Sequence, residues 1–92
     1  MKKNDFIKWH TRLGRMITLN TSDKTCQQYG FKAGDRIREP VKRRKATVMG
    51  VGPNLEGLFV LWFMIDGEER VSYYYEGEQD LKKSGAELIE QE

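Results

Sequence analysis

The chain has 92 residues, of which 38% are hydrophobic, 33% are charged and only 2 are proline. This composition is typical of one small globular domain, and it excludes a disordered tail and a collagen-like protein. The small core that such a chain can bury also argues against a deep catalytic cleft. The longest apolar run, Leu58 to Ile65, is too short for a membrane helix of roughly 20 residues, so no membrane association is expected.

The net charge of +2 conceals an uneven distribution of charge along the chain. Residues 1–45 carry 13 of the 16 Lys and Arg residues and 4 acids, whereas residues 46–92 carry the other 3 and 10 acids. One interpretation is that the two halves pair across a folded domain, and we favour it. The other interpretation is a basic face and an acidic face, which would steer charged partners or favour weak self-association.

Residues 1–30 are predicted to form an N-terminal extension that packs on the rest of the chain. Its first part, residues 4–17, has apolar side chains at spacings of three and four, the pattern of an amphipathic helix. These side chains are Phe6, Trp9, Leu13 and Met16. Gly14 and the β-favouring residues 16–19 indicate that this helix ends early and that a strand follows it.

A second, shorter helix is predicted to begin near residue 22. Ser22 is a good N-cap, and Gly30 is placed to adopt the left-handed conformation that ends a helix. Phe31 would then contact Cys26, one turn back. We expect Cys26 to be buried and unreactive. As the only cysteine it cannot form a disulfide within the chain, which favours an intracellular protein, cytoplasmic or nuclear.

From residue 31 onward the sequence has the pattern of a mainly β domain. Short runs rich in β-branched and aromatic residues alternate with turns that contain Gly, Pro and Asp. The predicted strands cover residues 36–38, 46–51, 58–65, 70–75 and 86–89. Asp66-Gly67 predicts a hairpin between the third and the fourth of these strands. About five short antiparallel strands at this spacing indicate a small barrel over residues 31–92.

Five short motifs stand between residues 31 and 90: Gly34-Asp35-Arg36-Ile37, Ala46-Thr47-Val48, Leu61-Trp62-Phe63, Asp66-Gly67 and Asp80-Leu81. Together they resemble the SH3-like small β-barrels, a superfold that includes the Tudor, KOW and mind-bomb-type domains. The resemblance concerns the fold and singles out no family within it. It implies a non-catalytic binding module.

No combination of residues predicts catalysis or a metal site. His10 is the only histidine and lies in a different predicted helix from Cys26, whereas metal sites of this kind need several ligands at set spacings. A glycine-rich phosphate loop and a nucleophile elbow are both missing. The acids between Glu68 and Asp80 fall in predicted turns, where they are normally solvated. We therefore expect no enzyme activity and no cofactor.

The stretch from residue 32 to residue 45 is strongly basic and predicts an alternative function. Its candidate phosphate-binding residues are Arg36, Arg38, Lys42, Arg43, Arg44 and Lys45. Small barrels with one basic loop and nearby aromatic side chains bind RNA or DNA. A solvated loop between two strands explains the same charges, and the acidic second half would repel a nucleic-acid backbone. We favour the solvated loop and keep nucleic-acid binding as the alternative.

An aromatic surface is the candidate that we prefer for partner binding. The run 58–65 is apolar on both faces, so one face fills the core and the other must be covered by the N-terminal segment or by another protein. We favour the N-terminal segment. In residues 70–75, Tyr73 and Tyr75 are predicted to face one way and Tyr74 the other. We predict that a protein or peptide partner binds this hairpin through Trp62, Tyr73, Tyr74, Tyr75 and Glu76.

Overall fold

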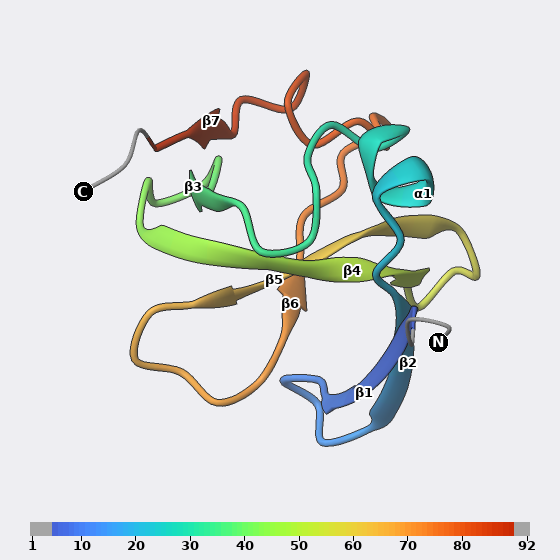
Figure 1. The fold of residues 1–92 in the computed structure, drawn as a ribbon. Helices are drawn as coiled ribbons and strands as arrows, with labels where there is room; N and C mark the ends of the chain where they lie inside the picture. Colours follow the sequence, from blue (N-terminus) through green and yellow to red (C-terminus); the bar gives the residue numbers. More distant parts are fainter. Residues whose placement is uncertain (1–4, 90–92) are drawn as a thin grey trace.

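The computed structural model describes residues 5–89, which form a mainly β fold with one short helix (Figure 1). The elements in chain order are β1 (Phe6–His10), β2 (Met16–Asn20), α1 (Asp23–Gln27), β3 (Arg36–Arg38), β4 (Lys45–Pro53), β5 (Phe59–Ile65), β6 (Ser72–Tyr73) and β7 (Glu87–Leu88). All pairings between these strands are antiparallel. The expectation of a mainly β chain is confirmed.

The long strand β4 organises the sheet. Along the path β1-β2-β4-β3-β7, it pairs with β3 near its start and with β2 near its end, while β5 pairs with β4 and then with β6. The pairing of β4 with β5 shifts register between Val48 and Gly50. Within residues 5–89 the sheet stays open, so the predicted closed barrel is wrong. A single bridge from Thr11 to Val71 joins the end of β1 to the start of β6, and the chain turns away immediately after Thr11.

The helix predicted over residues 4–17 is wrong: residues 6–20 form the β1–β2 hairpin, and residue 4 lies outside the described residues. Thr11 begins the connecting turn, where its N–H donates to the Arg15 carbonyl at 2.7 Å. Gly14 adopts a φ of 84° in this turn, a conformation that glycine adopts without strain. The true period of the segment is two, since Ile7 and Trp9 are half-buried and their neighbours are exposed. The strand expected after Gly14 is confirmed as β2.

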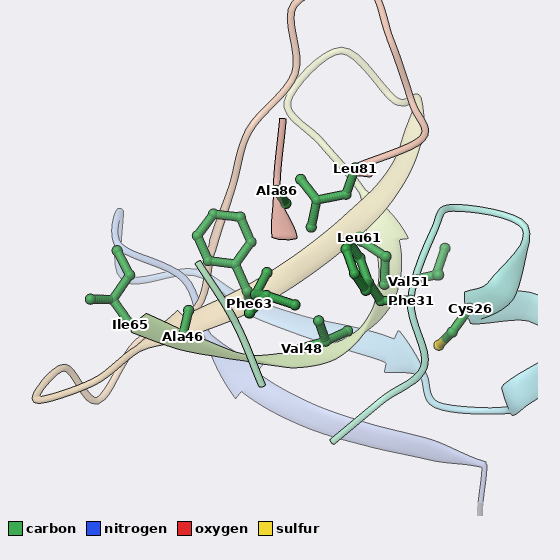
Figure 2. Packing of buried hydrophobic residues seen from close by; sticks show 11 residues of the cluster. Cys26, Phe31, Ala46, Val48, Val51, Leu61, Phe63, Ile65, Leu81 and Ala86 are labelled. Atoms are coloured by element: carbon green, nitrogen blue, oxygen red, sulfur yellow. The ribbon is translucent and has the colours of Figure 1, made fainter. Parts of the chain in front are cut away.

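The short second helix is confirmed as α1. The Ser22 side chain accepts a hydrogen bond from the Thr25 N–H at 3.3 Å, and this N-cap satisfies one of the free donors at the helix start. Gly30 has a φ of 115°, as expected after the helix end. Cys26 is fully buried and belongs to the same apolar cluster as Phe31 (Figure 2).

The strands predicted in the second part of the chain are present: β3 has the predicted ends, and the ends of the others are shifted. β4 is longer than predicted, and β6 covers only residues 72–73 of the predicted 70–75. Asp66 and Gly67 form the turn after β5, closed by a hydrogen bond from the Glu68 N–H to the Ile65 carbonyl at 2.9 Å. The division of the chain into an extension and a separate domain after residue 30 stays a prediction.

Two apolar clusters lie on opposite faces of β5. The larger one contains Cys26, Phe31, Ile37, Ala46, Val48, Val51, Leu61, Phe63, Ile65, Leu81 and Ala86 (Figure 2). The smaller one contains Leu19, Val60, Trp62 and Val71, with Ile7, Trp9, Ile17, Met49, Met64, Tyr73 and Tyr75 packed against it. The N-terminal segment therefore covers the second face of β5, as we expected, although it does so as a hairpin. Phe6 and Leu13 take no part in this cover because they are exposed.

Candidate functional site

The aromatic residues predicted to bind a partner are divided between the two faces of the sheet. Trp62, Tyr73 and Tyr75 belong to the smaller cluster, whereas Tyr74 packs against the larger one. The alternation predicted for the tyrosines is therefore confirmed. Glu76 is exposed beyond the end of β6. The candidate surface consequently reduces to Trp62 and the tyrosines on its own face.

Trp62 is fixed rather than freely exposed, with only 5% of its surface accessible. Its indole N–H donates to the Gly52 carbonyl at 3.1 Å, and its ring meets Tyr73 edge to face with the ring centres 4.7 Å apart. Both contacts orient the ring, and the small part of it that stays accessible contributes to the floor of a hollow.

A hollow of about 450 Å³ lies over Trp62, between the turns of two hairpins. The turn between β1 and β2 forms one wall, and the loop between β4 and β5 forms the other. Apolar side chains that line it include Leu13, Met16, Leu55, Trp62, Val71 and Tyr73. We call this hollow the Trp62 groove.

Polar contacts of Asn54 preform the wall of the Trp62 groove that the β4–β5 loop provides. The side-chain oxygen of Asn54 accepts hydrogen bonds from the Glu56 and Leu58 N–H groups at 2.8 and 3.0 Å, which fixes the β4–β5 loop. The loop then holds Leu55 outward, 64% exposed, and the opposite turn holds Leu13 outward, 70% exposed. Leucines so exposed on both sides of an apolar hollow are a feature of interaction surfaces.

Three arginines surround the turn between β1 and β2, beside the Trp62 groove. Arg12 forms an ion pair with Glu68 only at 3.9 Å. Arg15 also lines the groove, and its guanidinium takes part in no ion pair or side-chain hydrogen bond within residues 5–89. The guanidinium of Arg70 lies beside Gly14, 3.5 Å from the position that a Cβ would occupy there. The groove thus has a positively charged end.

No protein-family model matches this chain, and no curated protein is similar to it. The Trp62 groove is therefore interpreted from its own geometry. The sequence predicted its floor, Trp62 and Tyr73, but not the residues of its walls, such as Leu13 and Leu55. The alternation of Ile7 and Trp9 with polar residues, followed by a turn at Gly14, is the signal that could have indicated a hairpin there.

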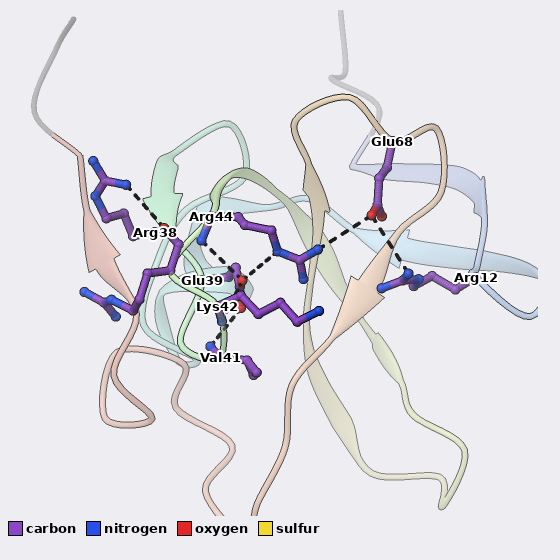
Figure 3. Close-up of polar contacts among 8 residues, drawn as sticks. Arg12, Arg38, Glu39, Val41, Lys42, Arg44 and Glu68 are labelled. Carbon is purple, nitrogen blue, oxygen red and sulfur yellow. Dashed lines mark hydrogen bonds and ion pairs between the residues drawn. The ribbon is translucent and has the colours of Figure 1, made fainter.

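The basic loop between β3 and β4 is built around a buried carboxylate, that of Glu39 (Figure 3). Glu39 is 1% exposed and accepts hydrogen bonds from the N–H groups of Val41, Lys42 and Arg44 at 2.8, 3.0 and 3.3 Å. The Arg44 side chain adds an ion pair at 3.0 Å. Burial raises the pKa of the Glu39 carboxyl, but Arg44 and the three N–H groups lower it by more, so its pKa lies below the usual value.

Most candidate phosphate-binding arginines are already engaged with protein groups. Arg36 forms a bidentate ion pair with Asp66, with both N–O distances at 2.7 Å, and this pair holds the pKa of the Asp66 carboxyl below its usual value. Arg43 pairs with Glu87 at 2.8 Å, and Arg38 donates to the Arg43 carbonyl at 3.2 Å. Lys42 takes part in no ion pair within the described part of the chain, whereas Lys45 has an interaction of its own.

The ion pairs join the basic first half of the chain to its acidic second half. Four of the five pairs among residues 5–89 do so, through Glu68 twice, Asp66 and Glu87. Arg44 lies between Glu39 and Glu68, and Glu68 lies between Arg44 and Arg12 (Figure 3). The charge asymmetry of the sequence is thus partly neutralised within the fold.

His10 and Cys26, which we expected to form no catalytic or metal site, lie in different elements of the fold. His10 is exposed at the end of β1, whereas Cys26 is buried in α1, where burial raises the pKa of its thiol. No group of three or more His, Cys, Asp or Glu side chains within residues 5–89 is arranged to hold a metal ion. In the same part of the chain, no helix has the length and hydropathy needed to cross a bilayer.

Proposed function

We propose that the protein is a non-catalytic interaction module that binds an extended peptide segment of a partner protein in the Trp62 groove. The observation that carries this proposal is the exposure of Leu13 and Leu55 on the two sides of a preformed apolar hollow. A small molecule inside the hollow would contact only the inner parts of both leucines, which line it, and would leave their outer parts in water. A peptide that crosses the groove would cover them as well as the floor.

We also propose that the open sheet is a variant of the SH3-like small barrels and that the protein acts inside the cell. The antiparallel pairing of β3, β4 and β5 in succession supports the fold assignment, because it unites the motifs at residues 34–37, 46–48 and 61–63. The buried single cysteine, Cys26, supports the reducing setting.

A displayed library of random heptapeptides tests the proposed function. Selection against the wild-type protein should yield peptides that bind it, and the Leu13→Asp/Leu55→Asp double variant should bind them at least about 100-fold more weakly. Each leucine that a peptide buries contributes about 1.5–3 kcal/mol, and 1.4 kcal/mol corresponds to a tenfold change in affinity. Fluorescence anisotropy of labelled peptides measures the loss.

The matched control is a Val41→Asp/Leu88→Asp double variant, which changes two other exposed apolar residues, both outside the Trp62 groove. It should bind within about twofold of wild type, because surface substitutions away from a site have small effects. If the selection yields no binding peptide, or if both double variants lose affinity equally, the groove is not the binding site.

Nucleic-acid binding is the alternative, and we expect it to fail a direct test. Arg36, Arg43 and Arg44 already pair with carboxylates, so a phosphate would have to displace those partners. A titration with single-stranded and double-stranded oligonucleotides at low salt should give no saturable anisotropy change up to about 10 µM protein, a range in which basic binding domains respond. Saturable binding that weakens steeply with salt would contradict this expectation.

A further inference from the structure

One main-chain edge at the Trp62 groove has no partner strand among residues 5–89. β6 pairs with β5 on one side, through Ser72 with Phe63 and Tyr73 with Trp62. On the other side, the Val71 N–H donates to the His10 carbonyl at 2.9 Å. Because the N–H and C=O groups of successive residues in a strand point to opposite edges, Ser72 points toward β5, and Val71 and Tyr73 point away from it.

The pairing of β4 with β5 gives the same assignment independently. The Asp66 N–H donates to the Lys45 carbonyl at 3.0 Å, so the main chain of Asp66 points toward β4. Alternation then points Met64 toward β4 and Phe63 toward β6. Phe63 and Ser72 are therefore the hydrogen-bonded pair, and the N–H and C=O of Tyr73 lie on the outer edge.

β1 covers this outer edge only at its start. The bridge at Val71 involves Thr11, the last residue before the chain turns away through Gly14. Tyr73 lines the Trp62 groove, and no strand in the described part of the chain pairs with its outer edge. Apart from the pairing of β6 with β5, no hydrogen bond within residues 5–89 uses the main chain of Tyr73. An unpaired strand edge of this kind is a template for a further strand.

We infer that the partner peptide binds by adding a short β-strand beside Tyr73, in the space that β1 leaves when it turns at Thr11. This inference rests on the proposed function and specifies how the groove recognises its partner. A peptide residue opposite Tyr73 would point its side chain to the same face as Tyr73 and Trp62, which is the apolar floor of the groove. Main-chain bonds would supply affinity, and the groove would select an apolar side chain.

The charge at the end of the groove specifies the partner further. Arg12, Arg15 and Arg70 lie around the turn where a peptide strand would continue the direction of β1. Only Arg12 has a carboxylate partner within residues 5–89, and the long distance of 3.9 Å leaves it available to another acid. The partner is therefore an extended segment that carries an apolar residue with Asp or Glu beside it.

Amide hydrogen exchange followed by NMR tests the added strand on the intact chain. The probe is the tightest-binding heptapeptide from the library selection, acetylated and amidated at its ends. Exchange of the Tyr73 amide should slow at least 10-fold when the peptide saturates the protein, because that N–H gains an acceptor. The Ser72 amide, which already pairs with Phe63, is the internal control and should change little.

Single N-methylation of each peptide amide provides the second measurement. It removes one donor and keeps every side chain, so one or two positions should lose at least 10-fold in affinity while their neighbours lose little. Selected peptides should be rich in Asp and Glu, and an Arg12→Gln/Arg15→Gln variant should bind them about 5-fold to 10-fold more weakly at low salt.

The outcomes separate this inference from the proposed function. Suppose that a peptide binds the wild type but not the Leu13→Asp/Leu55→Asp variant, while exchange of the Tyr73 amide is unchanged and every methylated peptide still binds. The Trp62 groove is then the binding site, and the added strand is wrong. If the selected peptides lack acids, the charge assignment is wrong. If no peptide is selected, the proposed function and this inference both fail.

Discussion

Replacing Gly50 with alanine is expected to lower the free energy of unfolding by about 3–5 kcal/mol, from overpacking and backbone strain together. Gly50 lies where β2 crosses close to β4, and a Cβ there would lie 2.9 Å from both the Asn20 carbonyl oxygen and the Leu19 Cβ. Neither neighbour is the flexible end of a side chain. Its φ of 155° adds strain for any residue with a Cβ. Urea unfolding followed by circular dichroism measures the loss.

Gly77→Ala is the control that measures the cost of backbone strain without the steric clash between β2 and β4. Gly77 has a φ of 82°, and its Cβ position has no atom within 4 Å. Its substitution should cost only about 1–2 kcal/mol, the penalty of the left-handed conformation. A chain of this length has a total stability of roughly 5–14 kcal/mol, so the two variants should be clearly distinguishable. Equal losses would show that β2 does not need to lie this close to β4.

The close approach of β2 to β4 also bears on the Trp62 groove. A Cβ at Gly52 would lie 2.8 Å from the Leu19 side chain, so β2 packs directly over this residue. The Gly52 carbonyl is at the same time the acceptor for the Trp62 indole N–H. Two glycines thus allow the β1–β2 hairpin to come near enough to Trp62 to form one wall of the groove.

The elements that the sequence predicted well are those with local signals. The run at residues 58–65 is dense in apolar residues and ends at Asp66-Gly67, and the strand at residues 36–38 alternates polar and apolar residues between turn residues, so local pattern is sufficient for both. The N-terminal hairpin was missed because its apolar residues happen to satisfy a helical period. The structure of residues 6–10 is decided by their pairing with β2, from Phe6 with Asn20 to His10 with Met16. A short stretch of sequence does not reveal this pairing.

The groove was predicted only in part for a similar reason. Trp62 and Tyr73 are bulky and stand in strands, so the sequence could single them out, and the alternation of the tyrosines was correct. Leu13 was assigned to the apolar face of a predicted helix, and Leu55 is an isolated apolar residue in a turn, so neither was singled out for binding. Only the folded sheet brings their two turns to opposite sides of Trp62.

Replacing Glu39 with glutamine is expected to lower the free energy of unfolding by about 2–4 kcal/mol. Glutamine keeps one acceptor, but its NH₂ group would point at N–H donors that now bond to the carboxylate, and the pair with Arg44 would be lost. The loop that carries the basic residues should unfold locally in this variant. Urea unfolding at pH 7 measures the difference.

The matched control is Glu87→Gln, which replaces an exposed carboxylate that pairs with an arginine at a similarly short distance. Glu87 pairs with Arg43 at 2.8 Å, but its side chain is 68% exposed. Exposed ion pairs contribute little, so this variant should lie within about 0.5–1 kcal/mol of wild type. If the two variants lost equal stability, the burial and the main-chain hydrogen bonds of Glu39 would not be what makes it important.

Lowering the pH should remove the difference in unfolding free energy between wild type and the Glu39→Gln variant. The pKa of Glu39 is lower in the folded protein than the unfolded value of about 4.3, so its stabilisation is complete above that value and is lost as the pH falls through the lowered folded pKa. Asp66, whose pKa is also lowered, is present in both proteins, so its contribution cancels in the difference. Unfolding free energies measured from pH 7 down to pH 2 should therefore converge. A gap that stayed constant over this range would mean that the charge of Glu39 does not stabilise the loop.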